Sequence, residues 1–183
     1  MLQQPELLAP AGSLETLKYA VMYGADAVYC ALPEFGMRAA PVNLTVGELR
    51  EGCIFAHARG KKVYLTLNTL LQNRELALAA ETGALAARLG IDAILVQDLG
   101  VAKLLRETCP DVPLHASTQM TVHDLAGIQA CADLGMTRVV LSREMSGEAI
   151  QELCKRSPVE IEIFGHGALC MCYSGQCFLS AVL

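Results

Sequence analysis

Three cysteines lie close together near the end of the sequence, in the stretch FGHGALCMCYSGQCFLS. They are Cys170, Cys172 and Cys177, and Gly167 and Gly175 allow the tight backbone that a metal-binding loop requires. Thiolates are the usual ligands of iron–sulfur clusters, and zinc also accepts cysteine and histidine. The C-x2-C spacing common in zinc sites is absent. From spacing alone, an iron–sulfur cluster, a zinc ion and no metal remain open alternatives.

The same stretch also contains the parts of a cysteine nucleophile. Such a nucleophile needs a neighbouring histidine as a base. His166 precedes Cys170 by four residues, which would bring the two together if this segment were helical. His115 is a second candidate base if the fold brings it to the same place. The HExxH motif of zinc proteases does not occur.

The remaining five cysteines are dispersed among apolar or helical stretches, and we expect each to be a small core side chain. They are Cys30, Cys53, Cys109, Cys131 and Cys154. The N-terminus resembles no signal peptide, and no apolar run reaches the roughly 20 residues that cross a membrane. We therefore expect a cytoplasmic protein without disulfides and without a membrane contact.

The 183 residues predict one α/β domain. Short runs rich in Val, Ile, Leu and Tyr, such as ADAVYCAL and IDAILVQD, follow helical stretches that end at glycine or proline. The order is strand and helix six times and then a seventh strand, which is typical of a parallel sheet with right-handed crossovers. Ser13 and Ser146 are expected to cap two of the helices, and Asp98 is either a cap or a site residue.

Two architectures fit this alternation, the (β/α)8 barrel and the open doubly wound sheet. The first strand is not followed by G-x-G-x-x-G, and the units are of similar length, which favours the barrel. We predict a TIM-like barrel over residues 1–183 that is truncated after the seventh strand. Its first and last strands would expose their edges, and we expect self-association through them.

Polar side chains follow the predicted strands at one rim, where barrel enzymes carry their active sites. We expect His115, Gln119, Arg143 and His166 to share a pocket there. Glu162 alternates with isoleucines inside the last strand, so its carboxylate needs a partner. Arg143 on the preceding strand is the expected partner, and an active-site carboxylate and a structural ion pair remain equally open.

The tail resembles the signature of the collagenase-like proteases, peptidase family U-32. Every constrained position of that signature is filled, by Glu162, Phe164, Gly167, Ala168, Leu169, Cys170, Gly175, Cys177, Leu179 and Ser180. The blocks ELLAPAGSLE, YGADAVY, TLNTLL, VQDLG, LHASTQ and VVLSRE are also similar to the family. The resemblance implies a TIM-like barrel and is strongest with the branch linked to RNA base hydroxylation.

This resemblance implies an iron–sulfur-dependent hydroxylase of ribosomal RNA cytidine or tRNA uridine. Cys170 and Cys177 would be two of four cluster ligands, the other two would lie beyond Leu183, and Cys172 is an additional candidate. In residues 1–183 alone the cluster would be absent or incomplete. The net charge of −5 opposes RNA binding by this segment, so parts outside it would bind the RNA. There are two alternatives. One is a collagenase-like peptidase, which would be a hydrolase with a protein substrate. The other is a non-catalytic scaffold.

Overall fold

The computed structural model describes residues 4–33, 43–167 and 170–177. The signature positions Ala168, Leu169, Leu179 and Ser180 lie outside these residues. The described chain forms seven strands: β1 (Leu8–Pro10), β2 (Ala27–Ala31), β3 (Lys62–Leu67), β4 (Ala93–Val96), β5 (Leu114–Ala116), β6 (Met136–Val140) and β7 (Glu160–Glu162). They alternate with six α-helices: α1 (Leu14–Met22), α2 (Val46–His57), α3 (Leu76–Leu89), α4 (Leu99–Thr108), α5 (Leu125–Asp133) and α6 (Gly147–Arg156).

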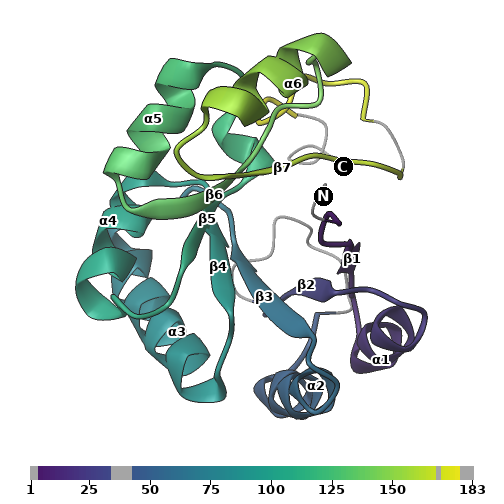
Figure 1. The fold of residues 1–183 in the computed structure, drawn as a ribbon. Coiled ribbons are helices and arrows are strands. Elements are labelled where there is room, and N and C mark those ends of the chain that lie inside the picture. The colour runs from purple at the N-terminus through teal and green to yellow at the C-terminus, as the bar shows by residue number, and fades with distance from the viewer. Residues whose placement is uncertain (1–3, 34–42, 168–169, 178–183) are drawn as a thin grey trace.

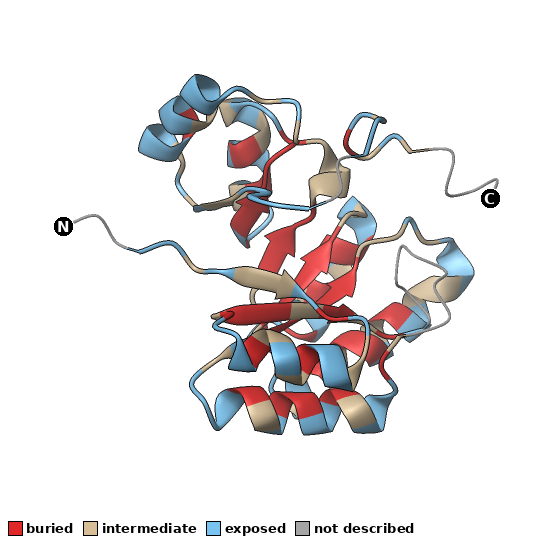
Figure 2. Cartoon of the chain, turned by 90° about the vertical axis from the view of Figure 1, so that its right-hand side faces the viewer, coloured by how far each residue is buried: buried red, intermediate tan, exposed pale blue. Residues whose placement is uncertain are grey.

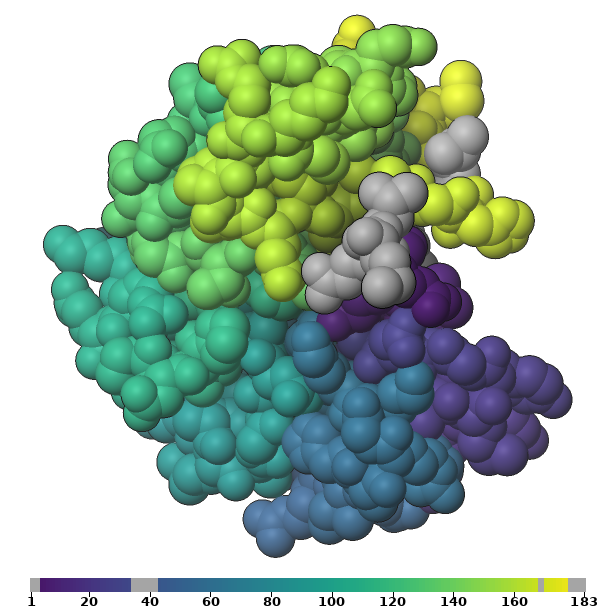
Figure 3. Space-filling view, in the orientation of Figure 1, coloured from purple at the N-terminus to yellow at the C-terminus, as the bar shows by residue number. Residues whose placement is uncertain are grey.

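The strands form one parallel sheet in the order of the sequence, β1 to β7. The sheet curls so that the helices cover its outer side and β1 and β7 are its two edges (Figure 1). This is a TIM-like partial barrel, as the alternation of elements predicts. The C-terminal part of the chain, in yellow, lies on the same side of the molecule as the purple N-terminal segment (Figure 3). Self-association through the two edges stays a prediction.

The helix ends follow the local rules of capping. Ser13 accepts a hydrogen bond from the backbone N–H of Thr16 and forms a capping box at the start of α1. Ser146 caps α6, and Asp98 caps α4 by accepting from two backbone N–H groups. Gly90 ends α3 with a φ of 75°, a left-handed conformation that favours glycine. None of the described helices is both long enough and apolar enough to cross a membrane.

The main core lies between the sheet and the helices. One face of each central strand packs there, with fully buried side chains such as Val28, Leu65, Ile94 and Leu114. Buried residues therefore concentrate in the strands and on the inward faces of the helices, while the outer helix faces are exposed (Figure 2). Of the five dispersed cysteines, four are buried as predicted. The prediction for Cys154 is wrong, because it lies on the exposed side of α6.

The opposite faces of the strands line the inside of the curled sheet. A small apolar cluster lies there, formed by Ala27, Tyr64, Ala93, Leu95 and Val140. Because side chains alternate along a strand, the residues two positions away from these also face the interior. Several of those residues are charged, and they form a polar region inside the curled sheet.

Candidate functional site

The cysteine loop is defined here as residues 170–177, which follow β7 after residues 163–169. The Sγ atoms of Cys170, Cys172 and Cys177 all lie within 4.8 Å of one another. None of the three is in a disulfide, and Cys170 is exposed while the other two are half-buried. The thiol contact with Cys177 raises the pKa of Cys172 above its ordinary value. The group of three contains no histidine or carboxylate, so its donor set is entirely sulfur.

Arg143, just after β6, fixes the backbone of this loop. Its Nη1 donates to the carbonyl oxygen of Cys170 at 2.9 Å, and its Nη2 donates to that of Cys172 at 2.8 Å. The planar guanidinium is suited to hold two acceptors at once. Arg143 therefore positions two of the three cysteines and carries a positive charge beside them.

Ser174 fastens the middle of the loop to the fold. It is 2% exposed, and its N–H and hydroxyl both donate to Oε1 of Glu144, at 2.8 and 3.2 Å. Partial burial opposes ionisation of Glu144, yet the N–H of Ser174 holds the pKa of that carboxyl below its usual range. The hydroxyl of Thr121 donates to the carbonyl oxygen of Ser174 at 2.9 Å. The loops after β5 and β6 thus hold the cysteine loop from two sides.

Gly175 is required at the point of closest approach. Its φ is 76°, and a Cβ placed there would lie 2.5 Å from the backbone carbonyl oxygen of Gln119 and would also meet the hydroxyl of Thr121. A side chain at this position would therefore push the cysteine loop away from the segment after β5.

An open pocket of about 410 Å³ lies between these loops. Its walls come from the segments after β5, β6 and β7 and from the cysteine loop, namely Thr118, Gln119, Arg143, Phe164, Gly165, His166, Gly167, Cys170, Tyr173, Ser174, Gly175 and Cys177. The structure thus brings Gln119, Arg143, His166 and two of the cysteines to one place. Their catalytic roles stay predictions.

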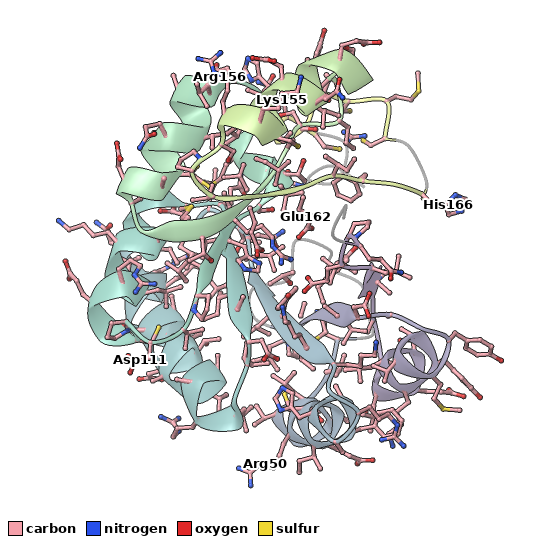
Figure 4. All side chains as sticks on the ribbon, viewed as in Figure 1. Arg50, Asp111, Lys155, Arg156, Glu162 and His166 are labelled. Atoms are coloured by element: carbon pink, nitrogen blue, oxygen red, sulfur yellow. The ribbon has the colours of Figure 1, made fainter. Side chains whose placement is uncertain are left out.

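The helical pairing of His166 with Cys170 is wrong. Residues 163–167 form no helix, since β7 ends at Glu162 and Gly167 has a φ of 149°. Among the described residues, no hydrogen bond joins His166 or His115 to Cys170. His166 belongs to the pocket wall but is exposed, at the outer end of the segment after β7 (Figure 4).

A second polar region lies inside the curled sheet, and we call it the interior ion cluster. Its centre is Arg138 of β6, whose guanidinium contacts Glu6 at 2.7 Å, Glu160 at 2.6 Å and Glu162 at 3.3 Å. The predicted pairing of Glu162 with Arg143 is therefore wrong. The register aligns Arg138 with Glu160 and Val140 with Glu162, so Arg138 lies beside both carboxylates, whereas Arg143 is beyond the strand. Figure 4 shows Glu162 pointing into this interior.

The surroundings shift the pKa values of two carboxyl groups of the cluster in opposite directions. Burial opposes ionisation of Glu6, but hydrogen bonds from Arg138, Lys62 and Tyr64 lower its pKa to about 2. Burial raises the pKa of Glu162 despite the neighbouring Arg138. Glu6 precedes β1 and Arg138 is on β6, so this contact spans the open side of the sheet.

His115 belongs to this interior and not to the rim, so its predicted place is wrong. It is the middle residue of β5, 4% exposed, and its ring lies edge-on to Tyr64 with centroids 5.0 Å apart. Its Nδ1 is buried and has no hydrogen-bond partner. Burial, followed by the charge of Arg138, lowers the pKa of His115 to about 3, which keeps the ring neutral.

Sequence reasoning did not select Arg138, Glu6 or Ser174. Arg138 and Glu6 could have been found by strand alternation, because each is two residues from an inward-facing apolar residue. Nothing in the sequence marks Ser174, since its role depends on where Glu144 and Thr121 lie in the fold.

The chain is similar to known proteins over almost its whole length. The family model of peptidase family U32 matches residues 12–183 of this chain. A tRNA hydroxylation protein P of Escherichia coli K12 is 41% identical over 181 residues, which cover 98% of this chain and 40% of the relative. A 23S rRNA 5-hydroxycytidine synthase of the same organism is 39% identical over 175 residues, which cover 96% of this chain and 26% of the relative. The chain thus spans less than half the length of these curated relatives.

A solved structure of a U32 peptidase has the same fold. It superimposes with a TM-score of 0.71 at 17% identity and covers 89% of this chain and 70% of its own. At this identity the likeness supports the fold alone.

Proposed function

The chain belongs to peptidase family U32, and on this premise we propose that it is part of an iron–sulfur-dependent enzyme that hydroxylates an RNA pyrimidine. The substrate would be uridine in tRNA or cytidine in ribosomal RNA. The observation that carries the proposal is the group of three thiols beside an open pocket, two of which, Cys170 and Cys177, are in its wall. Several clustered thiolates are what an iron–sulfur cluster needs, whereas a cysteine protease needs one. Relatives named for tRNA and rRNA hydroxylation support it.

The donor set fits an iron–sulfur cluster, because it consists of thiols and contains no competing carboxylate or imidazole. Cys170 and Cys177 would each supply a thiolate, and further ligands would come from outside residues 1–183. The bound cluster would supply one-electron chemistry next to the pocket. Arg143 would hold the loop backbone and offset the negative charge that thiolates and cluster bring.

The geometry gives less support to a peptidase. A cysteine protease needs its thiol in hydrogen-bond reach of a histidine. His166 is exposed, and among the described residues no hydrogen bond joins it to Cys170, the candidate nucleophile. His115 is buried in the interior against Tyr64. We therefore retain hydroxylation as the proposed function.

The RNA would be bound mainly by parts of the protein outside this chain. The net charge of −5 gives residues 1–183 no overall attraction for phosphates. The pocket would then receive a single base while other parts hold the RNA. Such a substrate implies that the protein works in the cytoplasm, where tRNA and ribosomes are found.

The test is a nucleoside analysis of cells that lack the full protein. Digested tRNA and ribosomal RNA are analysed separately by mass spectrometry for 5-hydroxyuridine and 5-hydroxycytidine. We expect one of these nucleosides to disappear, to return with the wild-type gene, and to stay absent with Cys170→Ala. Cys154→Ala, which changes an exposed cysteine on α6, is the control and should restore it. Unchanged levels of both nucleosides in the deletion strain would exclude the proposal.

A further inference from the structure

We propose that the ring of Tyr173 is the surface on which the substrate pyrimidine stacks, and that the side chain of Gln119 hydrogen-bonds the edge of the same base. Both residues are in the wall of the pocket. Tyr173 is not among the positions that the family signature constrains, so the signature gives it no role. The inference rests on the proposed function for the identity of the base, and it adds the residues that would bind that base.

The ring of Tyr173 is available to a ligand. The residue is 70% exposed, although it lies between the half-buried Cys172 and the buried Ser174. In the part of the chain that the structure describes, no contact joins its ring to another aromatic ring. Unpaired bases of RNA stack on aromatic rings that are exposed in this way. A base can therefore cover this ring without displacing a neighbouring side chain from it.

The backbone on both sides of this exposed ring is fixed. Before it, the carbonyl oxygen of Cys172 accepts a hydrogen bond from Arg143 at 2.8 Å. After it, the N–H of Ser174 donates at 2.8 Å to a carboxylate of the segment after β6. The carbonyl oxygen of Tyr173 itself accepts from the N–H of Gln176 at 3.0 Å, which closes a β-turn. The ring is thus positioned before a base arrives, and this reduces the entropy cost of stacking.

Gln119 supplies polar groups from another wall, the segment after β5. Among the described residues, no hydrogen bond involves its side-chain amide, so one donor and one acceptor are available there. The Watson–Crick edge of uracil or cytosine also offers a donor beside an acceptor, and an amide matches either base by turning over. Phe164, 52% exposed, adds an apolar surface from the segment after β7.

The size and the position of the pocket suit a single base. Its volume of about 410 Å³ lies in the range of small-molecule sites, about 300–1,000 Å³, which suits one nucleotide flipped out of an RNA rather than a folded stem. Cys170 and Cys177 are in the same wall as Tyr173. A base stacked on this ring would therefore lie beside the thiols that we assign to the cluster.

The first experiment measures how fast the hydroxylated nucleoside forms in cells. The full-length gene, wild type or variant, is induced in the deletion strain, and both nucleosides are followed by mass spectrometry. We expect the initial rate to fall by about tenfold or more in Tyr173→Ala, because the stacking surface is lost. Tyr173→Phe keeps the ring and should stay within about threefold of the wild type. Tyr23→Ala removes a similarly exposed ring at the end of α1 and is the matched control.

The iron content of the purified full-length protein shows whether a variant has lost the cluster instead of the base. Tyr173→Ala should contain as much iron per chain as the wild type and have the same visible absorption. A wild-type rate in Tyr173→Ala, an equal loss in Tyr173→Phe, or a loss of iron in Tyr173→Ala would each overturn the stacking assignment. If the wild type itself forms neither nucleoside, it is the proposed function that fails.

A second measurement needs neither a variant nor hydroxylation. The full-length wild type is irradiated with a short single-stranded RNA of uridines that contains one 5-iodouridine, a base that cross-links to aromatic rings on which it stacks. We expect mass spectrometry to find the cross-link on Tyr173 and not on Tyr23. Cross-links only at other residues, or none, would overturn the proposal. A cross-link at Tyr173 would stand even if the hydroxylation test fails, because no reaction of the enzyme is involved.

Discussion

The interior ion cluster and the cysteine loop place their polar groups in opposite ways. In the interior, Arg138 is 9% exposed, lies on a regular strand and contacts three carboxylates. In the loop, the three thiols are exposed or half-buried, and their backbone is held by Arg143 and through Ser174. In the interior, the charged side chains therefore pair with one another. In the cysteine loop, the hydrogen bonds hold the backbone and leave the thiol side chains available to bind a ligand.

This difference separates stability from chemistry. A buried charge with partners is costly to disturb, because removal of one partner leaves the others desolvated. An exposed thiol whose backbone is held in place can bind or release a metal ion with little change in the stability of the fold. We therefore expect substitutions in the interior to change the free energy of unfolding, and substitutions in the loop to change metal affinity.

The largest effect is expected for Arg138→Met. It removes the cation and leaves Glu6 and Glu162 in the interior, so the free energy of unfolding should fall by about 3–5 kcal/mol. Urea denaturation followed by circular dichroism measures this fall. Arg50→Met, at an exposed position of α2, is the control and should stay within about 0.5 kcal/mol of the wild type.

Removal of the carboxylates should reverse part of this loss. The triple variant with Arg138→Met, Glu6→Gln and Glu162→Gln no longer contains the unpaired charges, so it should be more stable than Arg138→Met alone. The affinity of the loop thiols for cobalt(II), measured by the thiolate charge-transfer absorption of the reduced chain, should be the same in the folded Arg138→Met variant as in the wild type. If Arg138→Met lowers metal affinity without changing stability, the division between the two regions is wrong.

The second prediction concerns how the stability of the chain at low pH depends on His115. The pKa of His115 is lowered from 6.5 to about 3 in the folded chain, so the unfolded chain binds the extra proton as the pH falls below 6.5. Its contribution to stability is thus present above pH 6.5 and is lost progressively toward pH 3. His115→Phe should reduce the slope of stability against pH in this window by up to about 1.4 kcal/mol per pH unit.

Urea titrations at several pH values measure this slope. Acid sensitivity from Glu6, with its pKa of about 2, should remain in the variant, because that carboxylate still needs Arg138. His123→Phe, at an exposed histidine, is the control and should keep the wild-type slope. An unchanged slope in His115→Phe would mean that the ring is already protonated, or accessible to water, in the folded chain.

The same contrast explains what the sequence could predict. Apolar runs between helix ends such as Gly90 define the seven strands, because burial on both faces leaves a clear local pattern. The partner of Glu162 depends on the register between β6 and β7, which no local pattern encodes. The sequence predicts His115 at the rim, wrongly, because the polar run that follows it hides where β5 ends.

For the site, the sequence gives the residue types and the fold gives their neighbours. The cysteines, Gln119 and Arg143 are predictable because unusual side chains cluster after the predicted strands. In the structure, Arg143 donates hydrogen bonds to backbone carbonyl oxygens. Because every residue has a backbone carbonyl, no sequence feature identifies which ones accept these bonds. Contacts between side chains and the backbone of a distant loop are therefore the part that needs a structure.

The smallest effect on stability, and the sharpest test of the loop, is expected for Gly175→Ala. The methyl group would meet the carbonyl oxygen of Gln119, and the φ of 76° disfavours alanine, so the loop should shift. The free energy of unfolding should fall by only about 1 kcal/mol, whereas cobalt affinity should fall by about tenfold. Gly165→Ala adds the same methyl group in open space and should change neither quantity. If Gly175→Ala destabilises the chain as strongly as Arg138→Met does, the cysteine loop is part of the folding core and its thiols are not held independently of it.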